Sequence, residues 1–110
     1  MKRRSVTVDQ KAKQDLLQIY HAIVLAGSPV SALAYLRRIE AFMQSLDLAS
    51  ERGTSLEEID PGLRSIPFES VVLAVRVSPS DVVVVRVFHA SQDWLRRLRR
   101  EAAAPRRDVD

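Results

Sequence analysis

Four residues in the second half of the chain could bind or act on a phosphate-containing ligand: Arg64, Arg76, Arg86 and His89. A guanidinium group binds phosphate through charge-assisted hydrogen bonds, and an imidazole can transfer a proton near neutral pH. Acid–base catalysis usually requires a second group to complete the proton transfer, but the sequence after Glu57 contains no lysine and no tyrosine. The residue types therefore indicate an incomplete catalytic site.

For three residues near the end of the chain, we favour a structural role over a catalytic or ligand-binding one. These residues are His89, Asp93 and Trp94. A lone histidine at the end of a strand usually hydrogen-bonds a carbonyl or a carboxylate, and Asp93 lies four residues after His89. Asp93 is suited to the first turn of a helix, where the positive end of the helix dipole stabilises a carboxylate. Trp94 is expected to anchor that helix to a sheet.

Arg76 and Arg86 each interrupt a run of β-branched residues. The runs at 71–77 and 82–88 are typical of strands, and the sequence SPSD at 78–81 is typical of a turn, so we predict an antiparallel hairpin. An unpaired buried charge is costly, so each arginine must reach water or an acidic partner. If residues 77 and 82 pair, the arginines point to opposite faces and are structural, and we favour this arrangement from the length of the loop. A bulge or another loop length would place both on one face as a basic surface.

The first half of the chain predicts two helices. Asp9 is suited to cap a helix over 10–25, and Ser28 with Pro29 is suited to begin a second helix that ends near residue 49. A connection this short makes the helices antiparallel. Apolar residues recur every three or four positions in both segments and predict one buried face on each, with Leu16, Ile19, Tyr20, Ile23, Leu36, Ile39 and Met43 among them.

Shorter elements complete the expected order. We predict a strand over 5–8, a loop over 51–55, a turn at Gly62, a short strand over 63–66 that Pro67 interrupts, and a final helix over 92–103 that Ser91 caps. Residues 104–110 are expected to be a frayed tail. The fold class is therefore α+β, with an antiparallel helix hairpin packed on a mostly antiparallel sheet and a short C-terminal helix.

Composition narrows the class of protein. The 110 residues form a single expected domain, 1–110, without internal repeats. The chain has no cysteine and two histidines, so we expect no disulfide, no metal site and no cofactor. We expect no membrane span, because no apolar run approaches about 20 residues, and no secretory signal, because the basic N-terminal segment lacks an apolar region. The expected compartment is the cytoplasm.

The net charge of +3 is unevenly distributed. Acidic residues concentrate in the centre of the chain, and basic residues concentrate near both ends. This pattern is compatible with an acidic partner, or with solvated charged ends that bind nothing. The basic residues near the ends are Lys2, Arg3, Arg4, Lys11, Lys13, Arg96, Arg97, Arg99, Arg100, Arg106 and Arg107.

Several short motifs, in this order and spacing, resemble the RelE/ParE family of type II toxins, and most closely its ParE branch. They are DLLQIY at 15–20, SP at 28–29, AYLRRI at 34–39, IDPGLR at 59–64, VRV at 75–77, VRVFH at 85–89 and QDW at 92–94. Two positions depart from the pattern, because Val75 replaces a frequent tyrosine and Ala90 replaces a frequent glycine. The first change removes a hydroxyl group, and the second can alter the direction in which the last helix leaves the sheet.

The resemblance implies a toxin that a ParD-like antitoxin neutralises in a hetero-oligomer, with an acidic, amphipathic segment of the antitoxin wrapped around an apolar groove. It implies inhibition of DNA gyrase by binding, with direct nucleic-acid binding by the toxin alone not expected. RelE-like members instead cut mRNA on the ribosome, and that activity would depend on Arg64, Arg76, Arg86 and His89. A protein of this fold that has lost its toxicity is a third possibility.

Two interaction surfaces follow from the resemblance. The expected antitoxin surface is an exposed apolar patch beside the two long helices, formed by Leu16, Ile19, Tyr20, Ile23, Leu36, Ile39 and Met43. The expected effector surface is the arginine-rich last helix, formed by Arg96, Arg97, Arg99 and Arg100, although these arginines could instead form a solvated helix face. Gly62, Asp93 and Trp94 are expected to have structural roles.

Overall fold

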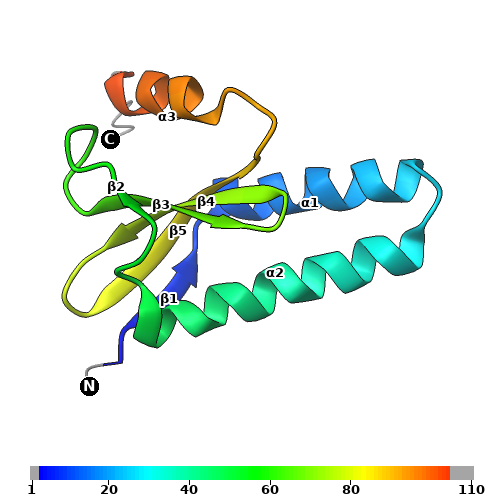
Figure 1. The fold of residues 1–110 in the computed structure, drawn as a ribbon, viewed down its shortest axis with the longest axis horizontal. Helices are drawn as coiled ribbons and strands as arrows, with labels where there is room; N and C mark the ends of the chain where they lie inside the picture. Colours follow the sequence, from blue (N-terminus) through cyan, green and yellow to red (C-terminus); the bar gives the residue numbers. More distant parts are fainter. Residues whose placement is uncertain (1–2, 105–110) are drawn as a thin grey trace, which may run out of the picture.

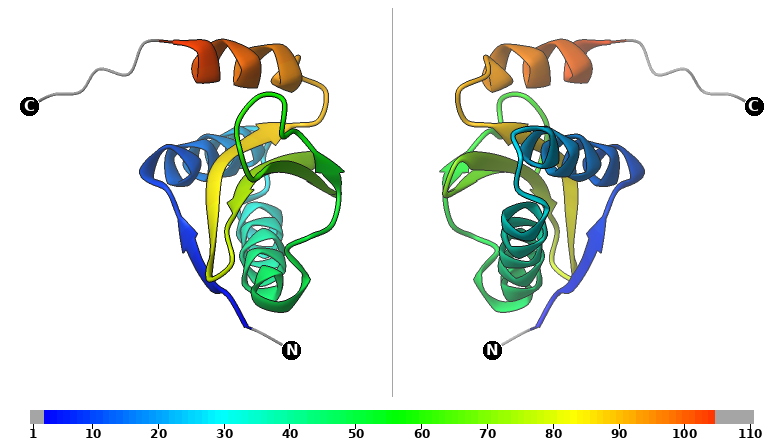
Figure 2. Two further views of the ribbon diagram at one scale, coloured as in Figure 1. Left: turned by 90° about the vertical axis from the view of Figure 1, so that its left-hand side faces the viewer. Right: turned by 90° about the vertical axis from the view of Figure 1, so that its right-hand side faces the viewer.

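The computed structural model describes residues 3–104, which form three layers (Figures 1 and 2). Two long helices cover one face of a sheet, and a short helix covers the other. The elements are β1 (Ser5–Val8), α1 (Gln10–Leu25), α2 (Pro29–Ala49), β2 (Thr54–Ser55), β3 (Leu63–Phe68), β4 (Val71–Val77), β5 (Asp81–His89) and α3 (Trp94–Ala103).

The five strands lie in the order β1-β5-β4-β3-β2. β1 runs parallel to β5, and every other pair is antiparallel. The hairpin β4–β5 is central, because β4 is flanked by β3 and β5 along its length. The predicted α+β class, with its N-terminal strand and C-terminal helix, is confirmed.

Local signals set the limits of α1 and α2. The Asp9 side chain accepts a hydrogen bond from the Gln10 N–H at 2.9 Å, and the Ser28 hydroxyl accepts one from the Ser31 N–H at 3.3 Å. Gly27 has φ +104° between the helices, a conformation that glycine adopts readily. Both helices therefore have the predicted bounds, and the hairpin that they form extends beyond the sheet (Figure 1).

The main core lies between the helix hairpin and the sheet. Side chains from α2, such as Ile39, Met43 and Leu46, are fully buried against Leu73 and Val84 of the sheet. Burial of each large apolar side chain contributes roughly 1.5–3 kcal/mol, so this layer holds the domain together. A smaller cluster under α3 comprises Leu56, Leu63, Ala74, Phe88 and Leu98.

Three local predictions were wrong. β3 continues through Pro67, which pairs with Val72 at a position where β2 no longer accompanies the strand, so the missing N–H costs no ladder bond. Residues 54–55, expected in a loop, form the short strand β2. α3 begins at Trp94, two residues later than predicted, because Ser91 bonds to His89 and does not cap the helix.

The predicted frayed tail at 104–110 falls almost entirely on residues 105–110, which lie outside the described residues. Within residues 3–104, no helix is long and apolar enough to cross a membrane.

Candidate functional site

A β-bulge decides the direction of Arg86. Val75 lies opposite Val84, but Ala74 lies opposite Arg86, so Val85 is an extra residue in β5. Arg76 and Ala74 are two residues apart in β4 and share a face, and Arg86 joins them on that face. The two arginines therefore both lie on the side of the sheet that α3 covers, and the prediction of opposite faces was wrong.

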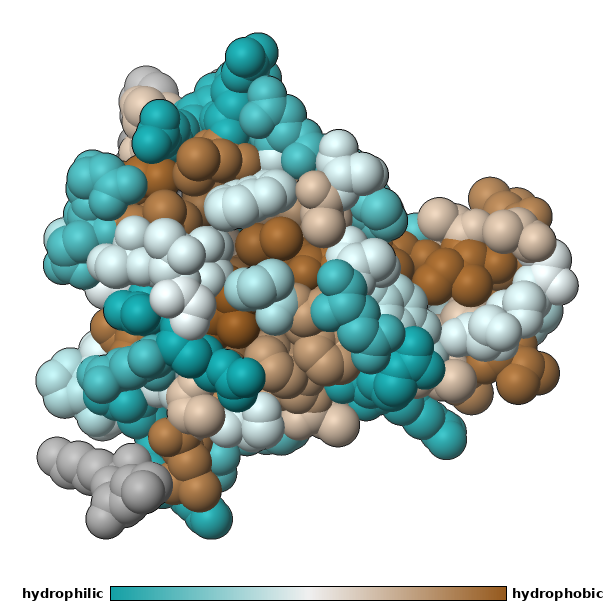
Figure 3. Space-filling view, viewed as in Figure 1, coloured by the Kyte–Doolittle hydropathy of each residue, from teal (hydrophilic) through white to brown (hydrophobic). Residues whose placement is uncertain are grey.

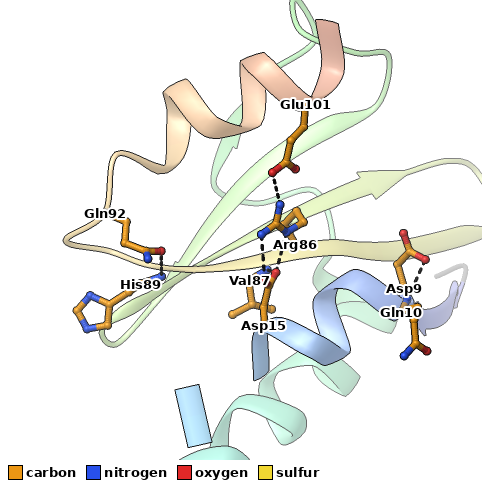
Figure 4. Close-up of polar contacts among 8 residues, drawn as sticks. All are labelled: Asp9, Gln10, Asp15, Arg86, Val87, His89, Gln92 and Glu101. Atoms are coloured by element: carbon orange, nitrogen blue, oxygen red, sulfur yellow. Dashed lines mark hydrogen bonds and ion pairs between the residues drawn. The ribbon is translucent and has the colours of Figure 1, made fainter. Parts of the chain in front are cut away.

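Arg86 is buried and joins three elements (Figure 4). Its guanidinium donates to the Asp15 carboxylate of α1 through Nε at 2.8 Å and Nη2 at 3.0 Å, and Nη1 pairs with Glu101 of α3. The pKa of Arg86 is raised above its ordinary value, first because Asp15 accepts these hydrogen bonds, while burial opposes the shift. The cation is thus held by two carboxylates from opposite sides of the sheet.

Arg76 and Arg64 are also engaged. Arg76 donates to the Asp60 carboxylate through Nε at 3.1 Å and Nη2 at 2.5 Å. Arg64 donates to the Arg52 carbonyl through Nε at 2.9 Å. The shared face of Arg76 and Arg86 is therefore not the basic surface that a same-face arrangement was expected to give, because each arginine has an acidic partner.

A cavity of about 260 Å³ lies beneath the end of α3, between these ion pairs. Its charged lining consists of the acids Asp9, Asp60 and Glu101 and the bases Lys11, Arg76 and Arg86. Neutralised guanidinium groups attract a phosphate only weakly, since the carboxylates would first have to leave. Among residues 3–104, no cluster of potential ligands could hold a metal ion.

His89 lies at the end of β5 and is exposed. Its Nδ1 accepts a hydrogen bond from the Ser91 N–H at 3.2 Å, and the Ser91 hydroxyl lies 2.6 Å from the same nitrogen. The proton of the neutral ring consequently sits on Nε2. The expected partner Asp93 instead pairs with Arg96 at 3.1 Å. His89 thus closes the turn between β5 and α3. Tyr35 of α2 lines the same pocket, and its hydroxyl is hydrogen-bonded to the Ser70 hydroxyl at 2.6 Å.

A larger groove of about 500 Å³ lies on the other side of Arg86, between α1 and the end of β5. Its apolar wall includes Ile19, Ile23, Val87 and Phe88. Its polar lining comprises Asp15, Gln18, Tyr35, Ser70, Arg86, His89, Ser91, Gln92 and Arg97. We call this site the α1–β5 groove.

The structure revises the predicted antitoxin surface. Leu16, Ile39 and Met43 are buried in the main core, because the sheet covers the inner face of the helix hairpin. Tyr20 and Leu36 are half-buried, and only Ile19 and Ile23 of the predicted set line the groove. Within residues 3–104, the exposed large apolar side chains are instead Leu17, Leu25, Val30, Leu33 and Leu48, all on the two long helices. Figure 3 shows hydrophobic side chains gathered where the hairpin ends.

The predicted arginines of α3 occupy different environments. Arg97 lies over the ring of Phe88 at 5.5 Å from its centroid and lines the α1–β5 groove, whereas Arg96 pairs with Asp93. Arg99 and Arg100 are exposed.

The residues with expected structural roles also have defined contacts. Trp94 is half-buried against the small cluster under α3. The Gly62 carbonyl accepts a hydrogen bond from the Val77 N–H at 2.8 Å, and Gly62 has φ +78°.

Sequence reasoning did not identify the acidic partners of the arginines. One signal for Asp15 was present, because the residue lies on the predicted apolar side of α1, between Ala12, Leu16 and Ile19. A carboxylate in such a position usually has a buried partner. Asp60 and Glu101 gave no comparable signal, because both lie in segments rich in charge.

The comparisons with known proteins agree with this fold. The family model described as the ParE toxin of type II toxin–antitoxin systems, parDE, matches residues 6–94. The fold is similar to a solved structure of a chromosomal ParDE toxin–antitoxin system from P. aeruginosa, with a TM-score of 0.70, 23% identity, and coverage of 81% of this chain and 98% of that chain. It is also similar to the toxin–antitoxin complex RelBE2 from Mycobacterium tuberculosis, with a TM-score of 0.59, 21% identity, and coverage of 84% and 97%. No curated protein matches the sequence.

Proposed function

The chain belongs to the ParE toxin family of type II toxin–antitoxin systems, and from this premise we propose that it inhibits DNA gyrase by binding to it, without making or breaking a covalent bond. The ion pairing of the arginines supports the proposal that the protein acts without making or breaking a covalent bond. Arg76 and Arg86, which would have to hold a phosphate in a ribonuclease, are paired with Asp60, Asp15 and Glu101. Lys11, Tyr35 and His89 are the other groups near these arginines that could transfer a proton, and the hydroxyl of Tyr35 and the ring of His89 are already hydrogen-bonded to Ser70 and Ser91, which supports a non-catalytic function.

Two assays test this proposal together. We expect the purified toxin to inhibit gyrase-catalysed supercoiling, and we expect primer extension on translated mRNA to show no new cleavage ends. The alternative function, a RelE-like ribosome-dependent ribonuclease, would give cleavage that His89→Ala abolishes. Inactivity in both assays would indicate a toxin fold without toxicity.

The proposed effector surface is the exposed part of α3 that carries Arg99 and Arg100. Both side chains face solvent, and neither pairs with a carboxylate within residues 3–104. Exposed cations steer association with an acidic surface and raise its rate. The double variant Arg99→Glu, Arg100→Glu should weaken gyrase inhibition, whereas Arg37→Glu, a charge reversal at an exposed position of α2, should not. Equal inhibition by all three proteins would place the effector surface elsewhere.

We further propose that a ParD-like antitoxin neutralises the toxin in the cytoplasm as a hetero-oligomer. The support is twofold. The two solved structures described above come from toxin–antitoxin systems, and the helices leave large apolar side chains exposed. Co-expression with a ParD-like antitoxin should yield a stable complex that does not inhibit supercoiling. Failure of the two proteins to co-purify would refute this pairing.

A further inference from the structure

We propose that the free toxin forms a symmetric dimer through the tip of its helix hairpin, so that a second copy of the chain occupies this surface. The hairpin tip comprises residues 22–36, which form the end of α1, the connection and the start of α2. This inference goes beyond the proposed inhibition of gyrase and does not depend on it.

The hairpin tip exposes large apolar side chains. Leu25 is 87% exposed, Val30 is 81% exposed and Leu33 is 42% exposed. The hairpin carries this segment beyond the end of the sheet (Figure 1), and hydrophobic side chains gather there on the surface (Figure 3). Val30 and Leu33 are three residues apart in α2, so they lie close together on one side of the helix. Exposed apolar side chains that gather in this way mark an interaction surface.

The hairpin tip carries no charge. Residues 22–36 contain no aspartate, glutamate, lysine, arginine or histidine, and the nearest titratable residues in the sequence are His21 and Arg37. An acidic partner segment would therefore gain no ion pair within this surface. A membrane is also a poor partner, because a helix that binds at a lipid surface is rich in basic residues beside its apolar face. The tip therefore fits a partner surface that is itself apolar and uncharged.

A second copy of the chain supplies such a surface. The chain has a net charge of +3, so two copies repel each other unless they meet through uncharged parts. The arginine-rich helix α3 lies at the end of the molecule away from the hairpin tip (Figure 1), so two copies that meet at their tips keep these arginines apart. Contact between the same patch on both copies is the arrangement that a twofold axis requires.

The connection at the hairpin tip is ordered before any partner binds. The Ser28 hydroxyl accepts the Ser31 N–H, Pro29 begins α2, and the Gly27 N–H donates to the Val24 carbonyl at 2.9 Å. A surface that is already ordered loses less conformational entropy on association. Two hairpins can then pack as a four-helix bundle. The tip is smaller than a standard interface, which takes about 20–30 residues a side, so the dimer should dissociate on dilution.

Sedimentation equilibrium of the purified toxin over a concentration series tests the dimer. The average mass should rise from that of one chain towards twice that value. Leu25→Glu and Val30→Glu should each keep the mass at the single-chain value, because each copy would then bury an unpaired carboxylate in the contact. Leu48→Glu is the matched control and should behave as the wild type, since Leu48 is also exposed near the C-terminal end of a long helix but lies outside the hairpin tip. Circular dichroism melts should show that all three variants remain folded.

The salt dependence of the mass identifies the force between the copies. An apolar contact between copies of like charge should persist or tighten as salt is added, whereas a contact of the α3 arginines with acidic residues should weaken. A wild-type toxin that stays a single chain at every concentration would overturn the dimer. Dimers of both tip variants as stable as the wild type, or loss of the dimer in Leu48→Glu as well, would overturn the assignment to the hairpin tip. A single-chain wild type whose tip variants lose binding to the antitoxin or to gyrase would assign the tip to that partner instead.

Discussion

Asp15 and Arg86, 71 residues apart in the sequence, meet in a bidentate ion pair at the point where β1 ends and β5 would otherwise have a free edge. The same carboxylate accepts the Val87 N–H, so Asp15 satisfies both a buried cation and a strand edge. Glu101 completes the arrangement from α3. One arginine thus connects α1, the sheet and α3, and it separates the charged cavity from the apolar groove.

Removal of Arg86 should strongly destabilise the fold. Arg86→Met leaves the Asp15 carboxylate, whose side chain is only 11% exposed, without its cation, and we expect a loss of about 3–5 kcal/mol in the free energy of unfolding. Denaturant melts measure the loss. Arg76→Met is the matched control, since the Arg76 side chain is 44% exposed, and it should cost about 0–1 kcal/mol. Similar losses for both variants would contradict the distinction between the two arginines.

Glu101 should control the attachment of α3. Glu101→Ala removes the ion pair that α3 makes with Arg86, and because Glu101 is partly exposed we expect a loss of only about 1 kcal/mol in global stability. The local effect should be larger. Trp94, the single tryptophan, lies in α3, so acrylamide should quench its fluorescence more readily in the variant. Unchanged quenching would show that the apolar contacts of α3 are enough to hold this helix on the sheet.

Gly62 should not tolerate a side chain. At φ +78°, a Cβ atom would also lie 2.5 Å from the Val77 carbonyl oxygen, so Gly62→Ala should destabilise the domain by about 1–3 kcal/mol. Gly27→Ala provides the comparison, because Gly27 also has positive φ but a Cβ there would meet nothing within 4 Å. Thermal melts should therefore show a larger loss of stability for Gly62→Ala than for Gly27→Ala. Equal losses would mean that the neighbouring backbone moves away from the added Cβ atom at no cost in stability.

The Arg38–Glu69 pair predicts a pH dependence. The pKa of Glu69 is lowered from its ordinary value of 4.5, first by the hydrogen bond from Arg38. A lowered folded-state pKa means that the pair stabilises the fold above pH 4.5 and that this contribution is lost as the pH falls through the folded-state value. Carboxyl NMR titration should place Glu69 below 4.5 in the wild type and closer to it in Arg38→Gln. An unchanged titration in the variant would refute the assignment.

The sequence by itself determined the elements that depend on local interactions. The bounds of α1 and α2 follow from side chains within a few residues, namely the caps at Asp9 and Ser28 and the apolar repeat between them. The hairpin β4–β5 follows from β-branched runs around a turn. The same runs could not reveal the bulge, because valines on both faces of a strand fit either register equally well.

Only the tertiary structure decided what the arginines do and which apolar residues remain on the surface. The extra residue Val85 turns Arg86 toward α3, while Asp15 reaches it from α1 around the end of β1. The sheet covers Leu16, Ile39 and Met43, and the α1–β5 groove exists because β1 ends at Val8, opposite Val84 of β5. Each of these outcomes depends on contacts between segments far apart in the chain, and the free energy of such contacts is set by packing geometry that no local pattern of residues records.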